Sequence, residues 1–167
     1  IGAHPSYPDR ENFGRFDLYI SNEELASSIL DQIDCLINIA AEQNCSISHV
    51  KPHGALYNSA ARNEKLATLI GDVIKSIDPS LPIMCLAGSR MVKTLKSMGM
   101  KVLPESFADR TYEPNGSLRK RTYSNALIAD PQISSLQAYN ISNNNKIIAH
   151  DGSEISIESK TLCVHSD

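Results

Sequence analysis

The sequence predicts an α/β protein with a parallel sheet. Short apolar runs alternate along the chain with longer stretches whose apolar residues recur at helical spacing. A repeated strand, helix, strand order is typical of right-handed βαβ units, whose strands lie parallel in one sheet. Histidines and charged residues follow several of the apolar runs. Because parallel strands bring their carboxyl ends to one edge, that edge is where we expect a functional site.

The apolar runs are the expected strands. They are bounded by turn residues or helical stretches and cover residues 1–4, 46–51, 82–86, 101–107 and 161–165. In the second run Pro52 restricts Lys51 to extended geometry, so the lysine belongs to the strand. Gly54 then lets the backbone turn, or approach another group closely, before a helix-like stretch follows.

Four helices are expected between these runs. The helix at 22–43 begins with a capping box formed by Ser21 and Glu24. The helix at 62–77 ends before Pro79, and the helix at 89–98 ends at Gly99, which suits a left-handed C-terminal cap. A fourth helix, at 131–141, has a weaker periodicity.

Two segments depart from the alternation. Residues 108–122 are rich in Arg, Lys, Pro and Gly and predict a long loop over one sheet end, with a turn at 113–116. Residues 146–157 are β-prone around Asp151-Gly152, which predicts a hairpin. No repeat or linker is evident, so we expect one domain over 1–167. The chain begins inside a strand and stops where a strand would lead into a loop, so we expect it to lack sequence at both ends.

Composition narrows the class of protein. The 167 residues are 41% hydrophobic, enough for a sizeable core. A net charge of −3 gives no reason to expect nucleic acid or an anionic membrane as a partner, and no apolar run approaches the roughly 20 residues of a membrane span. The cysteines form no C-x-x-C pair, and Cys35, Cys85 and Cys163 lie in apolar runs. We predict small buried hydrophobes in a reducing, cytoplasmic compartment, not disulfides or zinc ligands.

The ends of the expected strands carry the candidate functional residues. The first run leads into His4 and Arg15, the second into Lys51 and His53, the fourth into Glu105, Asp109 and Arg110, and the last into His165 and Asp167. Imidazoles transfer protons near neutral pH, carboxylates orient them, and cationic side chains bind anions. We therefore expect the three histidines to lie around one cleft together with Lys51.

Each candidate also has a structural interpretation. A single histidine beside an apolar run is usually a hydrogen-bonded structural residue, and we interpret His49 and His150 in this way. Lys51 could simply pair with Glu105 on a neighbouring strand, which contributes about 0–1 kcal/mol. Asp109 and Arg110 could hold the long loop. The basic run at 119–121 fits a solvated loop face better than a phosphate site.

Several familiar catalytic motifs are absent from the sequence. It contains no G-x-x-x-x-G-K-[ST] loop for ATP, no G-x-S-x-G elbow and no H-E-x-x-H pair. Ligands at the ends of barrel strands need not be close in sequence, so a divalent metal stays open, with no ligand assigned.

Four segments together resemble the LamB/YcsF family. They are GAHPSYPDRENFGR (2–15), VKPHGALYN (50–58), ESFADRTYEPNGSLRKR (105–121) and TLCVHSD (161–167), in the family's order and spacing. The resemblance implies a parallel (β/α) barrel of the glycoside hydrolase/deacetylase type, incomplete here because a family strand D-x-N-x-D-x-G-E and a segment A-C-G-F-H-A-G-D would precede Ile1. Phe16 replaces a second Arg, which would remove a salt bridge or anion contact, and Ser166 replaces a Gly, which would stiffen the turn beside His165.

The resemblance also implies an activity. The family's characterised member is one of the components, named A, of a bacterial ATP-dependent 5-oxoprolinase, a hydrolase that breaks the cyclic amide C–N bond of 5-oxo-L-proline to give L-glutamate. ATP would act at the level of a complex with subunits B and C, and a homo-oligomer stays open. The expected catalytic residues are His4, Lys51, His53, Glu105, Asp109, His165 and Asp167, and the expected substrate ligands are Arg15, Lys51 and Arg110.

Two other functions fit the same residues. One is a metal-dependent carbohydrate or amide hydrolase or deacetylase, by analogy with fold neighbours. The other is a non-catalytic subunit that binds the lactam or its partner subunits.

Overall fold

A parallel sheet contains the main strands of the chain. The structure, a computed structural model, describes residues 1–165. The strands are β1 (Gly2–Ala3), β2 (His49–Val50), β3 (Ile83–Leu86), β4 (Val102–Phe107) and β7 (Thr161–Cys163), in the order β1-β2-β3-β4-β7. The pairs β1–β2, β2–β3 and β4–β7 are parallel. All five predicted strands are confirmed, although each is shorter than its apolar run.

The predicted helices are confirmed to within a few residues. They are α1 (Asn22–Glu42), α3 (Glu64–Ile77), α4 (Arg90–Ser97) and α5 (Pro131–Asn144), and the helix-like stretch after His53 is the short α2 (Gly54–Ala60). The capping box closes as expected, because the Glu24 N–H donates to Ser21 Oγ at 3.2 Å and the Ser21 N–H donates to Glu24 Oε2 at 3.1 Å. Gly99 has a φ of +76°, as a left-handed cap requires.

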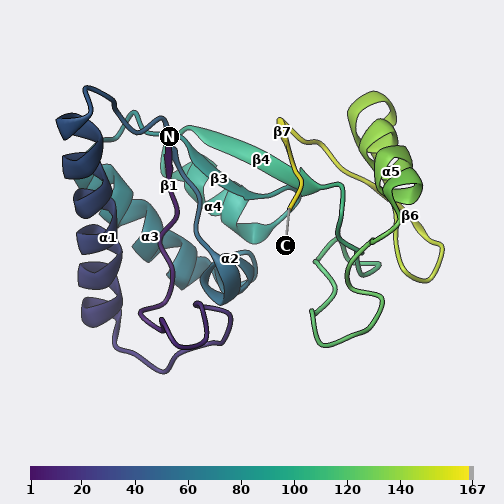
Figure 1. Ribbon diagram of the computed structural model, residues 1–167, viewed down its shortest axis with the longest axis horizontal. Coiled ribbons are helices and arrows are strands. Elements are labelled where there is room, and N and C mark those ends of the chain that lie inside the picture. The colour runs from purple at the N-terminus through teal and green to yellow at the C-terminus, as the bar shows by residue number, and fades with distance from the viewer. Residues whose placement is uncertain (166–167) are drawn as a thin grey trace. The chain divides into compact units, whose positions relative to one another are not determined.

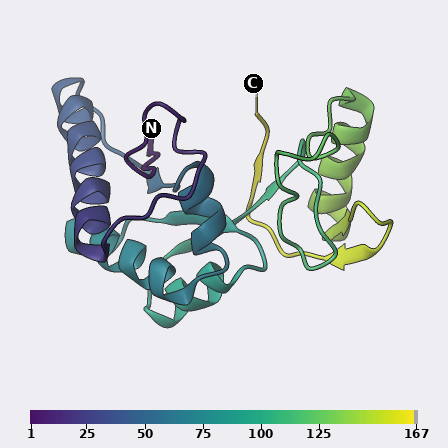
Figure 2. The same ribbon diagram turned by 90° about the horizontal axis from the view of Figure 1, so that it is seen from below.

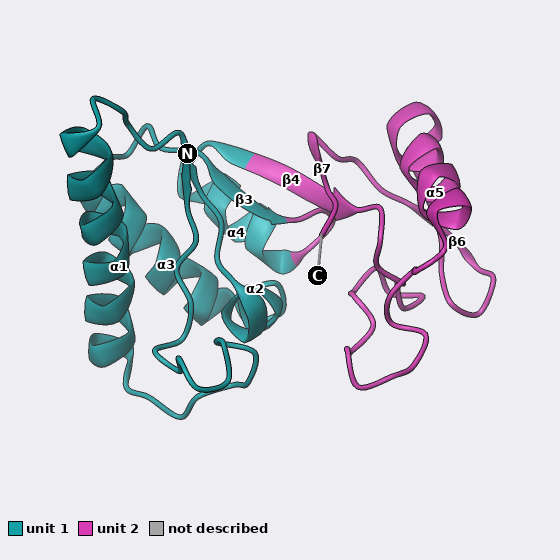
Figure 3. Cartoon of the chain, viewed as in Figure 1, with its two compact units in different colours: residues 1–85, 90–102 teal, residues 86–89, 103–167 magenta. Residues whose placement is uncertain are grey.

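The chain divides into two compact units, which Figure 3 colours separately. Unit 1 comprises residues 1–85 and 90–102, and unit 2 comprises residues 86–89 and 103–167. Each unit is described by itself below. The single domain expected from the sequence stays a prediction.

Unit 1 has a core of aliphatic side chains from α1, α3 and the strands. Helix α3 contacts both α1 and α4 (Figure 1). Ile29 and Ile33 of α1, Ile70 and Ile74 of α3, and Ile83 of β3 are all 0% exposed. Burying a side chain of this size contributes about 1.5–3 kcal/mol relative to leaving it exposed, so this cluster fixes how the helices cover the strands.

Unit 2 combines an irregular loop, the helix α5 and the predicted hairpin. Strands β5 (Lys146–Ile148) and β6 (Glu154–Ser156) pair antiparallel, and α5 lies beside this hairpin in both views of the ribbon (Figures 1 and 2). The buried side chains include Tyr112 from the loop and Ile147 from β5. The predicted turn is present, since the Gly116 N–H donates to the Glu113 carbonyl at 2.9 Å.

The cysteine prediction is partly wrong. Cys85 is buried as expected, but Cys35 is exposed and Cys163 is half-buried. Cys35 lies two positions after the buried Ile33, which places it on the opposite side of α1, since each helical residue advances about 100°. All four cysteines are free thiols. Within residues 1–165, none of the helices has the length and apolar character needed to cross a bilayer.

Candidate active site at the carboxyl ends of the strands

In unit 1, His4 and His53 are hydrogen-bonded to each other just beyond β1 and β2. His53 Nδ1 lies 2.9 Å from His4 Nε2, and the two rings meet edge to face with centroids 4.7 Å apart. The outer nitrogens contact backbone carbonyls: His4 Nδ1 lies 2.6 Å from the Lys51 carbonyl, and His53 Nε2 lies 2.9 Å from the Phe13 carbonyl. The sequence therefore correctly placed these two histidines together.

Parallel pairing and two glycines bring this pair together. The Lys51 N–H donates to the Ala3 carbonyl and the His53 N–H donates to the Pro5 carbonyl, each at 2.8 Å, so the two strand ends continue side by side. Gly54, at φ +56°, then leads the chain into α2, and the Ala55 N–H donates to the Gly14 carbonyl at 2.9 Å. The close approach expected at Gly54 is confirmed. Its neighbour is the loop that contains Gly14.

The cationic candidates of unit 1 surround the same strand ends. Lys51 is half-buried and directly follows β2, whereas Arg15 is exposed and its guanidinium carbon lies 5.3 Å from the centre of the Phe13 ring. That ring in turn meets the His53 ring edge to face at 5.1 Å. Phe16, which replaces an Arg of the family pattern, is 64% exposed. The loss of an anion contact that we expected from Phe16 stays a prediction.

In unit 2, Asp109 and His165 form a carboxylate–imidazole pair beyond β4 and β7. Asp109 Oδ2 accepts hydrogen bonds from the backbone N–H of His165 at 2.7 Å and from His165 Nδ1 at 2.9 Å. The imidazole stacks on Phe107, with ring centroids 5.7 Å apart and planes 9° apart. A proton on Nδ1 leaves Nε2 with a lone pair, so this arrangement presents Nε2 as a base.

The second oxygen of Asp109 is buried without a partner. Within residues 1–165, Asp109 Oδ1 is the buried side-chain nitrogen or oxygen that has no hydrogen-bond partner. Buried polar atoms nearly always have one, and unsatisfied exceptions concentrate at functional sites. Asp109 therefore orients His165 with one oxygen and keeps an acceptor for a further donor with the other.

Arg110 holds the long loop, as the structural interpretation suggested. Its Nη2 donates to the Arg119 carbonyl at 2.8 Å and its Nε donates to the Ala126 carbonyl at 3.3 Å. The side chain is 5% exposed. Burial lowers the pKa of the Arg110 guanidinium, the charge of Arg121 adds to this, and Asp109 opposes it. With these donors engaged, a substrate contact by Arg110 stays only a prediction.

Two residues that the sequence did not single out support the Asp109 segment. Gln137 of α5 points its Nε2 at the carbonyls of Phe107, Ala108 and Arg110, at 2.8, 3.1 and 2.9 Å. The fully buried Tyr112 accepts the Phe107 N–H on its hydroxyl oxygen at 2.8 Å. No local pattern marks either residue, because a mid-helix Gln and a loop Tyr acquire these partners only through the fold.

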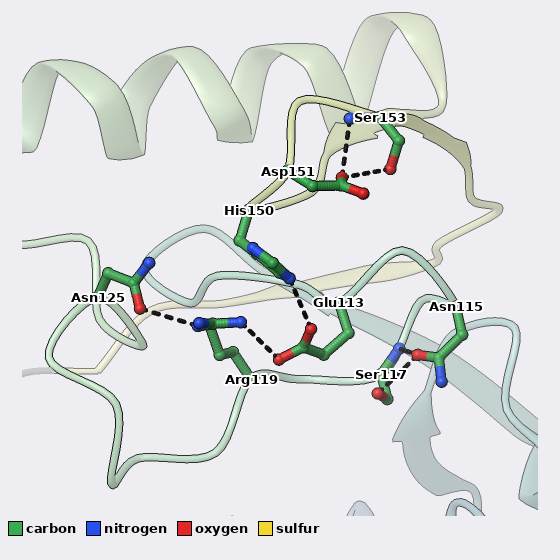
Figure 4. A network of polar contacts seen from close by, with 8 residues as sticks. All are labelled: Glu113, Asn115, Ser117, Arg119, Asn125, His150, Asp151 and Ser153. Atoms are coloured by element: carbon green, nitrogen blue, oxygen red, sulfur yellow. Dashed lines mark hydrogen bonds and ion pairs between the residues drawn. The ribbon is translucent and has the colours of Figure 1, made fainter.

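The basic run at 119–121 is not a uniformly solvated face, so that prediction is wrong for Arg119. Its Nη1 pairs with Glu113 at 2.8 Å, its Nε donates to Asn125 at 2.8 Å, and it lies over the Tyr123 ring (Figure 4). His150 contacts the other Glu113 oxygen at 2.8 Å, which agrees with the structural role expected for it (Figure 4). Lys120 and Arg121 are exposed.

The remaining candidates have mixed outcomes. Glu105 is 2% exposed in β4. Our alternative that Lys51 and Glu105 lie on neighbouring strands is wrong, because β3 lies between β2 and β4 in the sheet order. Asp167 and Ser166 lie outside the described residues. Over residues 1–165, no group of three or more His, Cys, Asp or Glu side chains is arranged to hold a metal ion. The single cleft uniting His4, Lys51, His53 and His165 stays a prediction.

The sequence and the fold both match known proteins. Residues 1–167 match the LamB/YcsF family throughout. The chain belongs to this family. Curated relatives include the 5-oxoprolinase A subunits of Halalkalibacterium halodurans, 42% identical over all 167 residues and 65% of the relative, and of Chloroflexus aggregans, 42% identical over 66% of the relative. A Haemophilus influenzae protein of the same name is 40% identical over 68% of its length.

A solved structure supports the fold of this LamB/YcsF chain. The lactam utilization protein from Thermus thermophilus matches with a TM-score of 0.90 and 35% identity, over 98% of this chain and 66% of that protein. The predicted α/β fold, a parallel strand–helix arrangement corresponding to an incomplete barrel, is confirmed. The chain spans about two thirds of the length of the relatives that it matches.

Proposed function

We propose that this chain contributes to the component named A of a bacterial ATP-dependent 5-oxoprolinase, in which the lactam ring of 5-oxo-L-proline is opened to L-glutamate. The family, the names of the curated relatives and the lactam utilization protein of similar fold support this proposal. The observation that carries the chemistry is the Asp109–His165 pair, because it offers an oriented base at the end of a strand.

Ring opening requires water to add to the lactam carbonyl and the ring nitrogen to leave as an amine. His165 Nε2 takes a proton from the attacking water as the new C–O bond forms, and Asp109 stabilises the resulting imidazolium. The imidazolium returns this proton to the ring nitrogen as the C–N bond breaks. One water molecule is consumed, and one carboxyl group and one amine are produced, so atoms and protons balance.

The remaining candidates bind and orient the substrate in this proposal. Lys51 and Arg15 supply positive charge for the substrate carboxylate, and His4, His53 and Glu105 complete the polar lining. Asp167 is proposed as a further carboxylate. ATP enters at the level of the complex with subunits B and C, because the sequence has no P-loop.

The test replaces the proposed base in the full-length protein. With both partner subunits present, His165→Gln is expected to lower the kcat for ATP-dependent glutamate release by about 10²–10⁴-fold, the usual contribution of general acid–base catalysis. His150→Gln is the matched control, since His150 pairs with Glu113, and its activity should stay within about twofold of wild type. Circular dichroism checks that both variants fold.

The same experiment separates the alternatives. Wild-type turnover in His165→Gln would remove the Asp109–His165 pair from the mechanism. If 5-oxoproline still binds and the histidine variants all turn over normally, the chain belongs to a non-catalytic binding subunit. If chelation abolishes activity while the His165 variant stays active, a metal-dependent hydrolase replaces this proposal.

A further inference from the structure

We infer that His4 and His53 share three ring protons and carry one positive charge as a pair, which makes the carboxyl ends of β1 and β2 a site for a small carboxylate anion. The inference follows from counting protons in the hydrogen bonds of unit 1. It goes beyond the proposed function, because it fixes the charge of a site whatever the substrate.

The two outer hydrogen bonds each require a proton on a ring nitrogen. Backbone carbonyls only accept hydrogen bonds. His4 Nδ1, 2.6 Å from the Lys51 carbonyl, must therefore carry a proton. His53 Nε2, 2.9 Å from the Phe13 carbonyl, must carry one as well.

The inner hydrogen bond requires a third proton. His4 Nε2 and His53 Nδ1 lie 2.9 Å apart, so one of them donates and the other accepts. Two neutral imidazoles have only two ring N–H protons between them. In the neutral pair, two lone pairs would face each other or one carbonyl contact would be lost. The observed geometry is thus that of an imidazole and an imidazolium sharing a proton.

The neighbouring charges nearly cancel without this proton. The segment at 5–17 contributes Arg10 and Arg15 against Asp9, Glu11 and Asp17, and the end of β2 contributes Lys51. Helix α2 contributes only the buried Tyr57 as a titratable group. Asp9 accepts from Asn12 and Asp17 accepts from Ser59, so these two carboxylates have local donors. The shared proton therefore gives this group of residues its net positive charge.

The proton also determines how the pair can meet a metal. All four ring nitrogens have hydrogen-bond partners in this arrangement. A metal ion needs an unprotonated nitrogen as its ligand, so it would have to displace the shared proton or one of the carbonyl contacts.

The proton count can be measured directly. In the intact protein labelled with ¹⁵N-histidine, a ¹H–¹⁵N correlation spectrum at about pH 7.5 should show three protonated nitrogens and one unprotonated nitrogen for these two rings, although an ordinary histidine is mostly neutral there. Loss of signals in His53→Gln assigns them. If that variant does not fold, contacts with the Phe13 ring assign His53 instead. Two protonated and two unprotonated nitrogens would overturn the inference.

The anion preference is tested with three probes across the pH at which the third proton leaves. Acetate and 5-oxoproline should each bind at least about tenfold more weakly once it has left, whereas the neutral lactam 2-pyrrolidinone should bind equally on both sides. If acetate follows this pattern and 5-oxoproline does not bind, the proposed function fails and the inference stands. If acetate binds equally well at both pH values, the anion site is refuted.

Discussion

Gly54 offers the sharpest test of how the loop at 5–17 is held against the strand ends. Its φ of +56° lies in the left-handed region, and a Cβ added there would lie 2.4 Å from the carbonyl oxygen of Gly14. That oxygen is backbone and accepts the Ala55 N–H at 2.9 Å. Gly99 is the matched control, because it has a φ of +76° but no atom within 4 Å of an added Cβ.

The two substitutions should differ by the cost of the contact. Gly99→Ala should cost only the left-handed strain, about 1–2 kcal/mol. Gly54→Ala adds the displacement of the Gly14 carbonyl. This breaks the Ala55 hydrogen bond, worth about 1 kcal/mol, and removes packing of the loop, so we expect about 3–4 kcal/mol in total.

Urea unfolding of the intact protein measures both losses of free energy. Equal destabilisation by Gly54→Ala and Gly99→Ala would contradict the reasoning, since it would mean that the loop does not lie where the Gly14 carbonyl is described. The proton count of the His4–His53 pair provides a second readout, because displacing this loop should also release the Phe13 carbonyl from His53.

Three further predictions concern unit 2 and the core. Gln137→Leu should cost about 2–3 kcal/mol in urea unfolding, because two N–H donors are lost from three backbone carbonyls, and kcat in the proposed reaction should fall with KM unchanged; an unchanged kcat would contradict a positioning role. Burial raises the pKa of Tyr112 above its usual 10, so the folded state keeps the phenol protonated: this contribution to stability is fully present below about pH 10 and declines above it. Tyr112→Phe should therefore remove that alkaline loss while costing about 1–2 kcal/mol at pH 7, as denaturation at both pH values will show. Ile29→Ala should cost about 2–5 kcal/mol, and a loss below 1 kcal/mol would mean that the cavity collapses.

The order of elements could be predicted because it depends on local patterns. The capping box at Ser21, the left-handed Gly99 and the Asp151-Gly152 turn each act over a few residues, and all three are present. Strand lengths were overestimated, since an apolar run records burial and not hydrogen-bonded pairing. Cys35 failed for a related reason, because an apolar neighbourhood in sequence does not specify the side of a helix.

The sequence by itself determined the alternation of strands and helices, and with it the principle that His4 and His53 would meet, because parallel strands place their ends together. Only the tertiary structure decided how the polar atoms are partnered. It paired Asp109 with His165, directed Gln137 at three carbonyls and engaged Arg110 with the loop. Hydrogen bonds between residues far apart in the chain depend on the position of whole elements, and no local pattern of residues encodes that position.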